Sequence, residues 1–340
     1  MMQLPTNIRV DEGSEFMFVD ALSIDQGVLI DPSLSVFARM EKIAERLVMI
    51  EEDVVHGRHL ETWQHRVGEL VWDMIWTADE DHDAAFAVMH LEIRHPYDVI
   101  HHLMAALVCG RLALASGLTD QERFSLVAGA LTHDIALLAM RGELEATAML
   151  TERQHRLVKA HCTDGAQMLR QLGVDDDLWI QVVCEHHEYL DGSGYIGLKD
   201  PQIGTPSRIM ALADAFSAML RPRPYRGRIN AKKALADLYA DSEGRYDKGL
   251  VRMLLLELGL FPPGSVLQLA NCETAVAIRP RRGFPQHPEV VAIINARDQP
   301  FSQAMERDTS RKETEIVSLL APERAGASRD VIAPCWEKPG

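Results

Sequence analysis

The sequence predicts a mainly α-helical protein: a helical bundle with an N-terminal helical extension and a small C-terminal β-rich segment. From Ser35 to about Leu258, apolar residues recur at three- and four-residue steps, which is the period of amphipathic helices. After Pro262-Pro263-Gly264 the pattern changes to short apolar runs between turn residues, which is typical of β-strands. The predicted units are an extension over 1–80, a helical domain over 81–260, a β-rich segment over 261–300 and a flexible tail over 301–340.

Two short apolar runs at the start of the N-terminal extension, residues 16–19 and 27–30, have the character of small strands. Two long amphipathic helices are predicted to follow, over about 35–55 and 60–78. The segment has no evident cofactor or response-regulator motif. An input, docking or dimerisation role, including formation of a homodimer, is therefore a hypothesis that depends on these helices alone.

The central domain is predicted to be a succession of helices, some with recognisable ends. Gly117 is expected to cap the end of one helix. Thr119 and Glu122 have the spacing of a capping box at the start of the next helix, and Thr151 is expected to open a further one. The predicted helices cover about 82–93, 96–117, 120–138, 151–172, 179–187, 207–220, 231–239 and 248–258.

The C-terminal part is predicted to contain three short strands, over 266–269, 274–278 and 290–294. Past about Phe301 the chain is polar, with arginine, glutamate and serine dominant. Such a composition buries little apolar surface, so this tail is expected to be loose.

The composition narrows the class of protein. A net charge of -15, from 50 acidic and 35 basic side chains, argues against binding a nucleic-acid polymer, which needs a basic surface. No signal peptide and no apolar run of about 18 residues is evident, so no membrane association is expected. Five scattered cysteines suit a reducing cytoplasm. Cys162 and Cys184 lie close to histidines, but plain buried residues are the favoured interpretation of both.

The most informative stretch is His186-His187-Glu188, followed by the glycine-rich turn from Asp191 to Tyr195. Further histidines and aspartates fall on predicted helices or their ends. One buried histidine is usually a satisfied core residue, but burying this many polar groups without a metal or a network would cost several kcal/mol. Helical bundles commonly build metal sites from such side chains. The candidate ligands are His101, His133, Asp134, His161, His186, His187 and Asp214.

Seven candidate ligands exceed the needs of one ion and suit two metals about 3.5–4 Å apart with a bridging carboxylate. Asp134 is the natural bridge, because it adjoins the ligand His133. Imidazole and carboxylate together suit iron, manganese or zinc. Two such ions would lower the pKa of a bridging water and hold a phosphate against it.

These residues resemble the HD-GYP family of metal-dependent phosphodiesterases, a branch of the HD superfamily, over about residues 80–300. The resemblance implies an HD-type helical bundle that holds two or three iron or manganese ions. It also implies hydrolysis of cyclic di-GMP to linear pGpG or onward to GMP. The matching residues are His101, His133-Asp134, His161 with Gly165, His186-His187-Glu188, Asp191 to Tyr195, Arg208, Asp214 and Arg223 to Arg226.

The resemblance places all seven candidate ligands on the family's metal-ligand positions. Some members have a glutamate four residues before the first histidine, which recruits a third metal. That position is Tyr97 here, so two metal ions are expected. Asp134 is the expected catalytic residue, and the residues expected to bind substrate are Tyr195, Arg208, Arg223 and Arg226, the arginines as phosphate-binding or structural groups.

Three positions depart from the family's pattern. The usual His-Asp-Ile-Gly-Lys motif lacks its lysine, because Leu137 stands there, and no basic residue follows before Arg141. Ile196 replaces the proline of the Gly-Tyr-Pro motif, so the loop lacks the ring that fixes φ. Ser217 stands where an aspartate is usual. Loss of a cation beside the phosphate is expected to lower the rate of hydrolysis.

The complete set of metal positions favours a phosphodiesterase that hydrolyses cyclic di-GMP to pGpG, GMP or both through a hydroxide bridging two ions. The altered positions favour an alternative: a catalytically weak or inactive module that binds metal or nucleotide and acts in regulation or docking. A third interpretation is a phosphohydrolase of another nucleotide, since a fold does not fix its substrate. The possible partners are cyclic di-GMP as the ligand and diguanylate cyclase-type or other signalling proteins.

Overall fold

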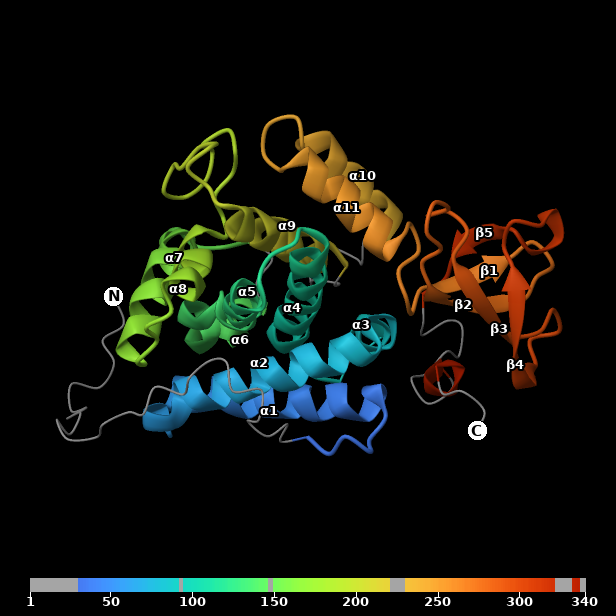
Figure 1. The fold of residues 1–340 in the computed structure, drawn as a ribbon, viewed down its shortest axis with the longest axis horizontal. Helices are drawn as coiled ribbons and strands as arrows, with labels where there is room; N and C mark the ends of the chain where they lie inside the picture. Colours follow the sequence, from blue (N-terminus) through green and yellow to red (C-terminus); the bar gives the residue numbers. More distant parts are fainter. Residues whose placement is uncertain (1–29, 92–93, 146–148, 221–229, 322–331, 337–340) are drawn as a thin grey trace.

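The computed structural model describes residues 30–91, 94–145, 149–220, 230–321 and 332–336. Helices form most of the molecule, and a small sheet lies at its C-terminal end (Figure 1). The predicted mainly α fold is confirmed. The predicted strand at 16–19 and all of 27–30 except Ile30 lie outside the described residues.

Two long helices follow one another at the N-terminal end, α1 (Val36–His56) and α2 (Trp63–Glu80), with the short 3-10 turn η1 (Leu60–Thr62) between them. The side chain of Ser35 accepts a hydrogen bond from the backbone N–H of Ala38 and so caps α1. Gly57, with φ +63°, ends the helix in the left-handed region.

The remaining helices form the rest of the bundle. Both predicted helix starts are confirmed as capping boxes, Thr119 with Glu122 and Thr151 with Gln154. The elements are α3 (His82–Leu91), α4 (Tyr97–Ala115), α5 (Asp120–Thr132), η2 (Ile135–Met140), α6 (Arg141–Glu145), α7 (Glu152–Gln171), α8 (Asp177–Glu185), α9 (Thr205–Leu220), α10 (Ala231–Asp241) and α11 (Lys248–Leu258).

Two predicted helices are shorter than expected, and both end at candidate ligands. The helix predicted over 120–138 ends at Thr132, and the helix predicted over 179–187 ends at Glu185. The imidazole Nδ1 of His133 lies 2.9 Å from the carbonyl oxygen of Ala130, and that of His186 lies 2.8 Å from the carbonyl oxygen of Val183. These side chains satisfy carbonyls of the last helical turn, so each histidine lies at a helix end.

A five-stranded antiparallel sheet follows α11, with strand order β4-β3-β2-β1-β5. The three predicted strands are confirmed, but the predicted flexible tail is wrong over its first part, which forms β4 and β5. Both are edge strands. The side chains of β4 are mostly exposed, so its composition resembled that of a loop, whereas β5 is a short apolar run within a polar region. The strands are β1 (Val266–Leu269), β2 (Thr274–Arg279), β3 (Glu289–Ile294), β4 (Pro300–Asp308) and β5 (Ile316–Leu319).

One hydrophobic core runs from Ile30 to Leu258 and includes the buried faces of α1 and α2. The two N-terminal helices therefore pack as part of the bundle; the predicted division of the chain at residue 80 stays a prediction. Two segments, Tyr97–Ala115 and Asp120–Leu144, are long and apolar enough to cross a membrane by length and composition. They are 78% and 67% buried inside the protein, as core helices are, so they are weak indications of a membrane span.

Candidate metal centre

The seven predicted ligands come from five places in the bundle and meet in its interior. His101 lies in α4, His161 in α7 and Asp214 in α9. The pairs His133-Asp134 and His186-His187 directly follow α5 and α8. Four of the histidines have a relative exposure of 3% or less: His101, His133, His161 and His186.

Asp214 lies among three of the histidines. Its Oδ1 is 3.0 Å from Nε2 of His101 and 3.8 Å from Nε2 of His133. Its Oδ2 is 3.8 Å from Nδ1 of His187. One carboxylate from α9 thus contacts imidazoles from three other parts of the chain.

Asp134 lies among a second, overlapping set of histidines. Its Oδ1 is 3.1 Å from Nε2 of His161, and its Oδ2 is 3.5 Å from Nε2 of His133. Nε2 of His161 lies 2.9 Å from Nε2 of His186. Because His133 lies near both carboxylates, the two sets form one continuous cluster.

Two groups of three side chains within this cluster are compact enough to hold an ion, with their ligand atoms within 4.8 Å of one another. One group is His101, His133 and Asp134; the other is His161, His186 and Cys162. The Cys162 thiol is 3.7 Å from Nε2 of His161 and 3.9 Å from Nε2 of His186. Sequence reasoning favoured Cys162 as a plain buried residue, and the structure places it beside candidate ligands.

Hydrogen bonds to backbone carbonyls orient three of the imidazoles. Nδ1 of His133, His161 and His186 each faces the carbonyl oxygen of the residue three positions earlier in the chain. A proton on Nδ1 leaves the lone pair of Nε2 free toward the cluster, which is how most metal-binding histidines are held.

Ser217 orients His101 in a similar way. Its hydroxyl donates to the carbonyl oxygen of Ala213 and lies 3.1 Å from Nδ1 of His101, from which it can accept. The serine at this departure from the family's pattern is therefore a direct partner of a candidate ligand.

The protonation states suit a divalent cation, which needs ionised carboxylates and neutral imidazoles. Burial lowers the pKa of His133 to about 4 and also lowers the pKa values of His186 and His187. Burial alone would raise the pKa of Asp214, but the hydrogen bond and charge of His101 outweigh it and hold that pKa well below its usual range.

Asp134 and His161 form the most strongly coupled pair. Burial opposes ionisation of Asp134, but the neighbouring histidines lower its pKa well below the usual range. Burial likewise disfavours the His161 imidazolium, but the hydrogen bond to Asp134 raises the pKa of His161 to about 11. A cation bound here would displace that proton, so metal binding and proton release are linked at this pair.

The donor set fits divalent metal ions. Imidazole nitrogens with ionised carboxylates suit borderline and hard divalent cations. Nε2 of His133 is buried and has no hydrogen-bond partner among the described residues. An unsatisfied buried nitrogen is costly, and a metal ion would supply the missing partner.

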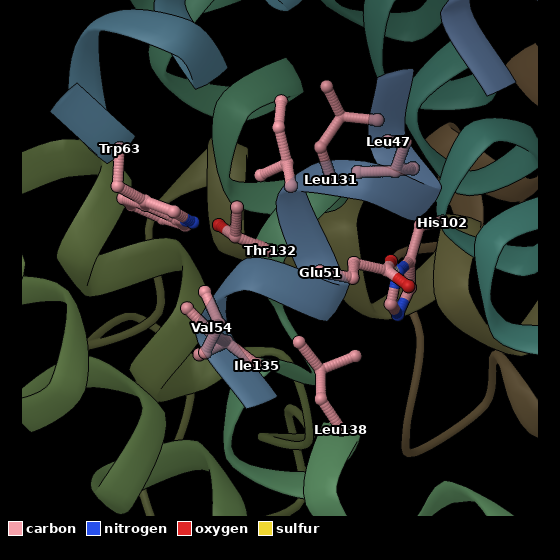
Figure 2. Close-up of a pocket in the computed structure, with 10 residues that line it drawn as sticks. Leu47, Glu51, Val54, Trp63, His102, Leu131, Thr132, Ile135 and Leu138 are labelled. Carbon is pink, nitrogen blue, oxygen red and sulfur yellow. Dashed lines mark hydrogen bonds and ion pairs between the residues drawn. The ribbon is translucent and has the colours of Figure 1, made fainter. Parts of the chain in front are cut away.

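His102 is a residue of this region that sequence reasoning missed. It is 1% exposed and lies next to His101, so the His101-His102 doublet could have indicated it, as the His186-His187 doublet did. Its Nδ1 lies 2.8 Å from Oε1 of Glu51 in α1, and Figure 2 shows these two side chains facing one another. Glu51 also pairs with Arg141.

Glu188 fixes the glycine-rich loop. Its carboxylate accepts hydrogen bonds from the backbone N–H of Ile196 at 2.8 Å and of Leu198 at 2.6 Å. A side chain at Gly194 would collide with Glu188, because a Cβ there would lie 2.5 Å from its Oε1. Glu188 therefore holds the loop through the N–H of Ile196, a donor that proline lacks.

The loop carries Tyr195 against the cluster. The centre of its ring lies 4.7 Å from that of His187 and 6.1 Å from that of His161. Burial raises the pKa of Tyr195 to about 12, so its hydroxyl stays protonated near neutral pH.

Of the three predicted phosphate-binding arginines, the structure describes the surroundings of Arg208. Arg208 donates to the carbonyl oxygen of Ile203 at 2.8 Å and pairs with Asp200 and Asp247, so its guanidinium is already engaged in structural contacts. This arrangement favours the structural role considered for Arg208. Arg223 and Arg226 lie outside the described residues.

The family's lysine position is Leu137 here, and the described residues of η2 form no ion pair with a basic side chain. Leu137 lies in η2, and the nearest following basic residue, Arg141, pairs with Glu51 and Asp98. The guanidinium of Arg141 is therefore engaged by the buried carboxylate of Glu51 and the partly buried carboxylate of Asp98.

Comparison with known proteins agrees with this geometry. A sequence model of the HD domain family matches residues 80–250. The chain is 27% identical over 217 residues to a cyclic di-GMP phosphodiesterase of Pseudomonas aeruginosa, covering 63% of this chain and 52% of that protein. It is 36% identical over 141 residues to the 3'3'-cGAMP-specific phosphodiesterase 1 of Vibrio cholerae, covering 40% of this chain and 32% of that protein.

A third relative is the cyclic di-GMP phosphodiesterase response regulator RpfG of Xanthomonas campestris, 34% identical over 154 residues, 44% of this chain and 40% of that protein. The chain thus spans about half or less of the length of these relatives.

A solved structure with the same fold is that of an HDG"Y"P protein from Bdellovibrio bacteriovorus. Its TM-score is 0.56 at 17% identity, with 67% of this chain and 74% of that chain covered. At this identity the likeness shows the fold alone. Together with the family match over residues 80–250, it confirms the resemblance to HD-GYP proteins. All seven candidate ligands fall inside the matched residues, which are half of the chain, and the chain belongs to the HD domain family.

Proposed function

We propose that this protein is a metal-dependent phosphodiesterase that hydrolyses cyclic di-GMP to pGpG, GMP or both. The observation that carries this proposal is the buried cluster in which Asp134 and Asp214 share His133 and each contact a further histidine. The similarity to phosphodiesterases of cyclic di-GMP and of 3'3'-cGAMP supports a cyclic dinucleotide as the substrate class.

The ligand set supports two divalent ions, iron or manganese. His101, His133 and Asp134 would hold one, and His161 and His186 belong to the group that would hold the other. Asp134 contacts a histidine of each group, so it is the residue best suited to join them. His187 and Asp214 complete the set through their mutual contact. When bound, such ions supply Lewis-acid activation of water and of the phosphodiester.

The surrounding residues have separate tasks. Backbone carbonyls hold His133, His161 and His186 with Nε2 toward the cluster. Glu188 fixes the loop that places Tyr195 over His187, where its ring offers an aromatic face to a nucleotide. Arg208, Arg223 and Arg226 remain predicted phosphate-binding residues, with a structural role favoured for Arg208.

A second candidate function is a metal- or nucleotide-binding regulatory module. Leu137 favours it, because a leucine cannot stabilise charge at a phosphate as a lysine would. A cytoplasmic location, a homodimer and a signalling partner such as a diguanylate cyclase are compatible with both functions and stay predictions.

The discriminating experiment uses the full chain purified without oxygen and loaded with iron or manganese. Elemental analysis gives the number of ions per chain, and incubation with cyclic di-GMP or 3'3'-cGAMP gives the product. We expect two ions and a linear dinucleotide or mononucleotide. Tight binding of the cyclic dinucleotide without turnover would instead support the regulatory module.

A further inference from the structure

We propose that His102 is a further metal ligand of this centre and that Glu51 of α1 orients it. The inference rests on the proposed metal centre and adds an eighth side chain to its ligand set. Glu51 lies outside residues 80–250, the part of the chain that the HD domain family matches.

The position of His102 is the first argument. Its Nε2 lies 3.8 Å from Oδ2 of Asp134, and the centre of its ring lies 4.8 Å from that of His133. A separation of 3.8 Å is too long for a direct hydrogen bond, and Nε2 is buried with no hydrogen-bond partner among the described residues. Nε2 of His133 is also buried without such a partner and lies 3.5 Å from the same oxygen of Asp134. One ion near Asp134 would satisfy both nitrogens.

The orientation of His102 is the second argument. The carboxylate of Glu51, with its side chain 4% exposed, lies 2.8 Å from Nδ1 and fixes the proton on that nitrogen. Nε2 then faces Asp134, where it would offer its lone pair to a bound cation (Figure 2 shows the Glu51–His102 pair). A carboxylate behind a histidine is the usual support of a metal ligand, since it fixes the ring and raises its basicity.

The charge around Glu51 is the third argument. Arg141 pairs with both Glu51 and Asp98, so the carboxylate behind His102 is held on its other side. Arg141 thereby places a positive charge against the buried Glu51 carboxylate, as a buried charge requires. Glu51 of α1 therefore contacts both His102 of α4 and Arg141 at the start of α6, which couples α1 to the proposed metal centre.

His82 provides a matched control. It is also a buried histidine of this bundle, with Nε2 3.1 Å from the carbonyl oxygen of Leu107 and Nδ1 without a hydrogen-bond partner. Neither His82 nor His102 belongs to a compact group of candidate ligands in the described part of the chain. Of the two, His102 is the one that lies beside a candidate carboxylate, with its Nε2 3.8 Å from Oδ2 of Asp134. His82→Gln and His102→Gln thus remove similar buried rings, and only the second removes the proposed ligand.

The test is proton NMR of the full chain loaded with Co²⁺, in which each bound imidazole gives an exchangeable N–H resonance shifted by the paramagnetic ion. We expect His102→Gln to lose one such resonance and to weaken Co²⁺ binding at least tenfold in competition with a chelator. His82→Gln should keep every resonance. Glu51→Gln should keep the number of resonances and weaken binding about tenfold, as removal of an outer carboxylate does.

The outcomes separate the two proposals. If folded His102→Gln keeps every shifted resonance and the affinity of the unaltered chain, the inference is wrong and the metal centre stands. If His102→Gln does not fold, unaltered Co²⁺ affinity in Glu51→Gln overturns the inference. If the unaltered chain binds no Co²⁺, iron or manganese, the proposed function fails and the inference fails with it.

Discussion

At the scale of single residues, the departures from the HD-GYP pattern have specific partners in this structure. Ile196 donates its backbone N–H to Glu188, which a proline could not do. Ser217 provides a hydroxyl to His101 at 3.1 Å. Near Leu137, the described residues show no such compensation from the next basic residue, because Arg141 pairs with Glu51 and Asp98. Two of the three changes therefore preserve the support of the site, and the third removes a cation.

Restoring the family's proline is expected to weaken this protein. Ile196→Pro removes the N–H that Glu188 accepts, and a hydrogen bond to a buried charged group contributes about 2 kcal/mol. Ile196→Val keeps the N–H and serves as the control. Urea unfolding of both variants measures the effect; equal midpoints for Ile196→Pro and the unaltered chain would show that this bond contributes nothing.

Asp134 is expected to be indispensable for metal binding. Asp134→Ala removes the carboxylate that contacts His133 and His161, so we expect metal content to fall from two ions per chain toward none and turnover to disappear. Asp237→Ala, which alters an exposed aspartate paired with Lys233, should change neither. Elemental analysis after dialysis is the measurement, and an unchanged metal content in Asp134→Ala would contradict the ligand assignment.

At the scale of elements, close contact between helices positions the candidate ligands. Gly129 in α5 packs against Val182 in α8, and a Cβ at Gly129 would lie 2.8 Å from Cγ1 of Val182. These two helices end beside His133 and His186, whose ring centres are 5.0 Å apart. The absence of a side chain at Gly129 therefore allows the two ends to approach closely enough to place their ligands in one cluster.

Gly129→Ala tests this contact. Alanine favours a helix over glycine by about 1 kcal/mol, but overpacking against a branched side chain costs about 1–3 kcal/mol. We expect a net loss of stability of about 1 kcal/mol and weaker metal binding. Val182→Ala in the same chain should relieve the clash, so the two substitutions together should cost less than the sum of each alone. Simple additivity in thermal unfolding would argue against the contact.

At the scale of the whole molecule, one core joins the N-terminal helices to the rest of the helical bundle. Buried polar groups also lie in the bundle outside the candidate metal centre, and one of them is His82. Burial lowers the pKa of His82 to about 4, because its imidazolium would lose its hydration. The folded protein therefore holds His82 neutral at a pH where the unfolded chain binds a proton.

The stability of the protein is expected to fall with acid through His82. Below about pH 6.5 the unfolded chain takes up a proton that the folded protein accepts only near pH 4, so the free energy of unfolding decreases across that window. The contribution reaches about 3 kcal/mol near pH 4 and is absent above about pH 7. His82→Gln removes it, so its difference from the unaltered chain should change with pH over this window. A difference in unfolding free energy that is constant from pH 7 to pH 4 would refute the assignment.

The sequence by itself determined the mainly α fold and the histidines and aspartates of the cluster. Helical periodicity and capping patterns at Thr119 and Thr151 are local, so they can be recognised without the structure. Edge strands such as β4 are stabilised by backbone pairing with a neighbour, so their polar composition did not reveal them. The helix ends at His133 and His186 could not be predicted either, because they involve contacts of the imidazoles with backbone carbonyl oxygens, which helical periodicity does not reveal.

Only the tertiary structure decided which polar residues support the ligands. Glu51 and His102 are 51 residues apart, and their contact depends on how α1 packs against α4. The engagement of Arg208 and Arg141 by carboxylates likewise follows from packing. A sequence pattern fixes the chemistry that a residue can offer, but pairing of buried charges is set by the three-dimensional arrangement of distant segments. The candidate ligands could therefore be named from the sequence, whereas the residues that orient them could not.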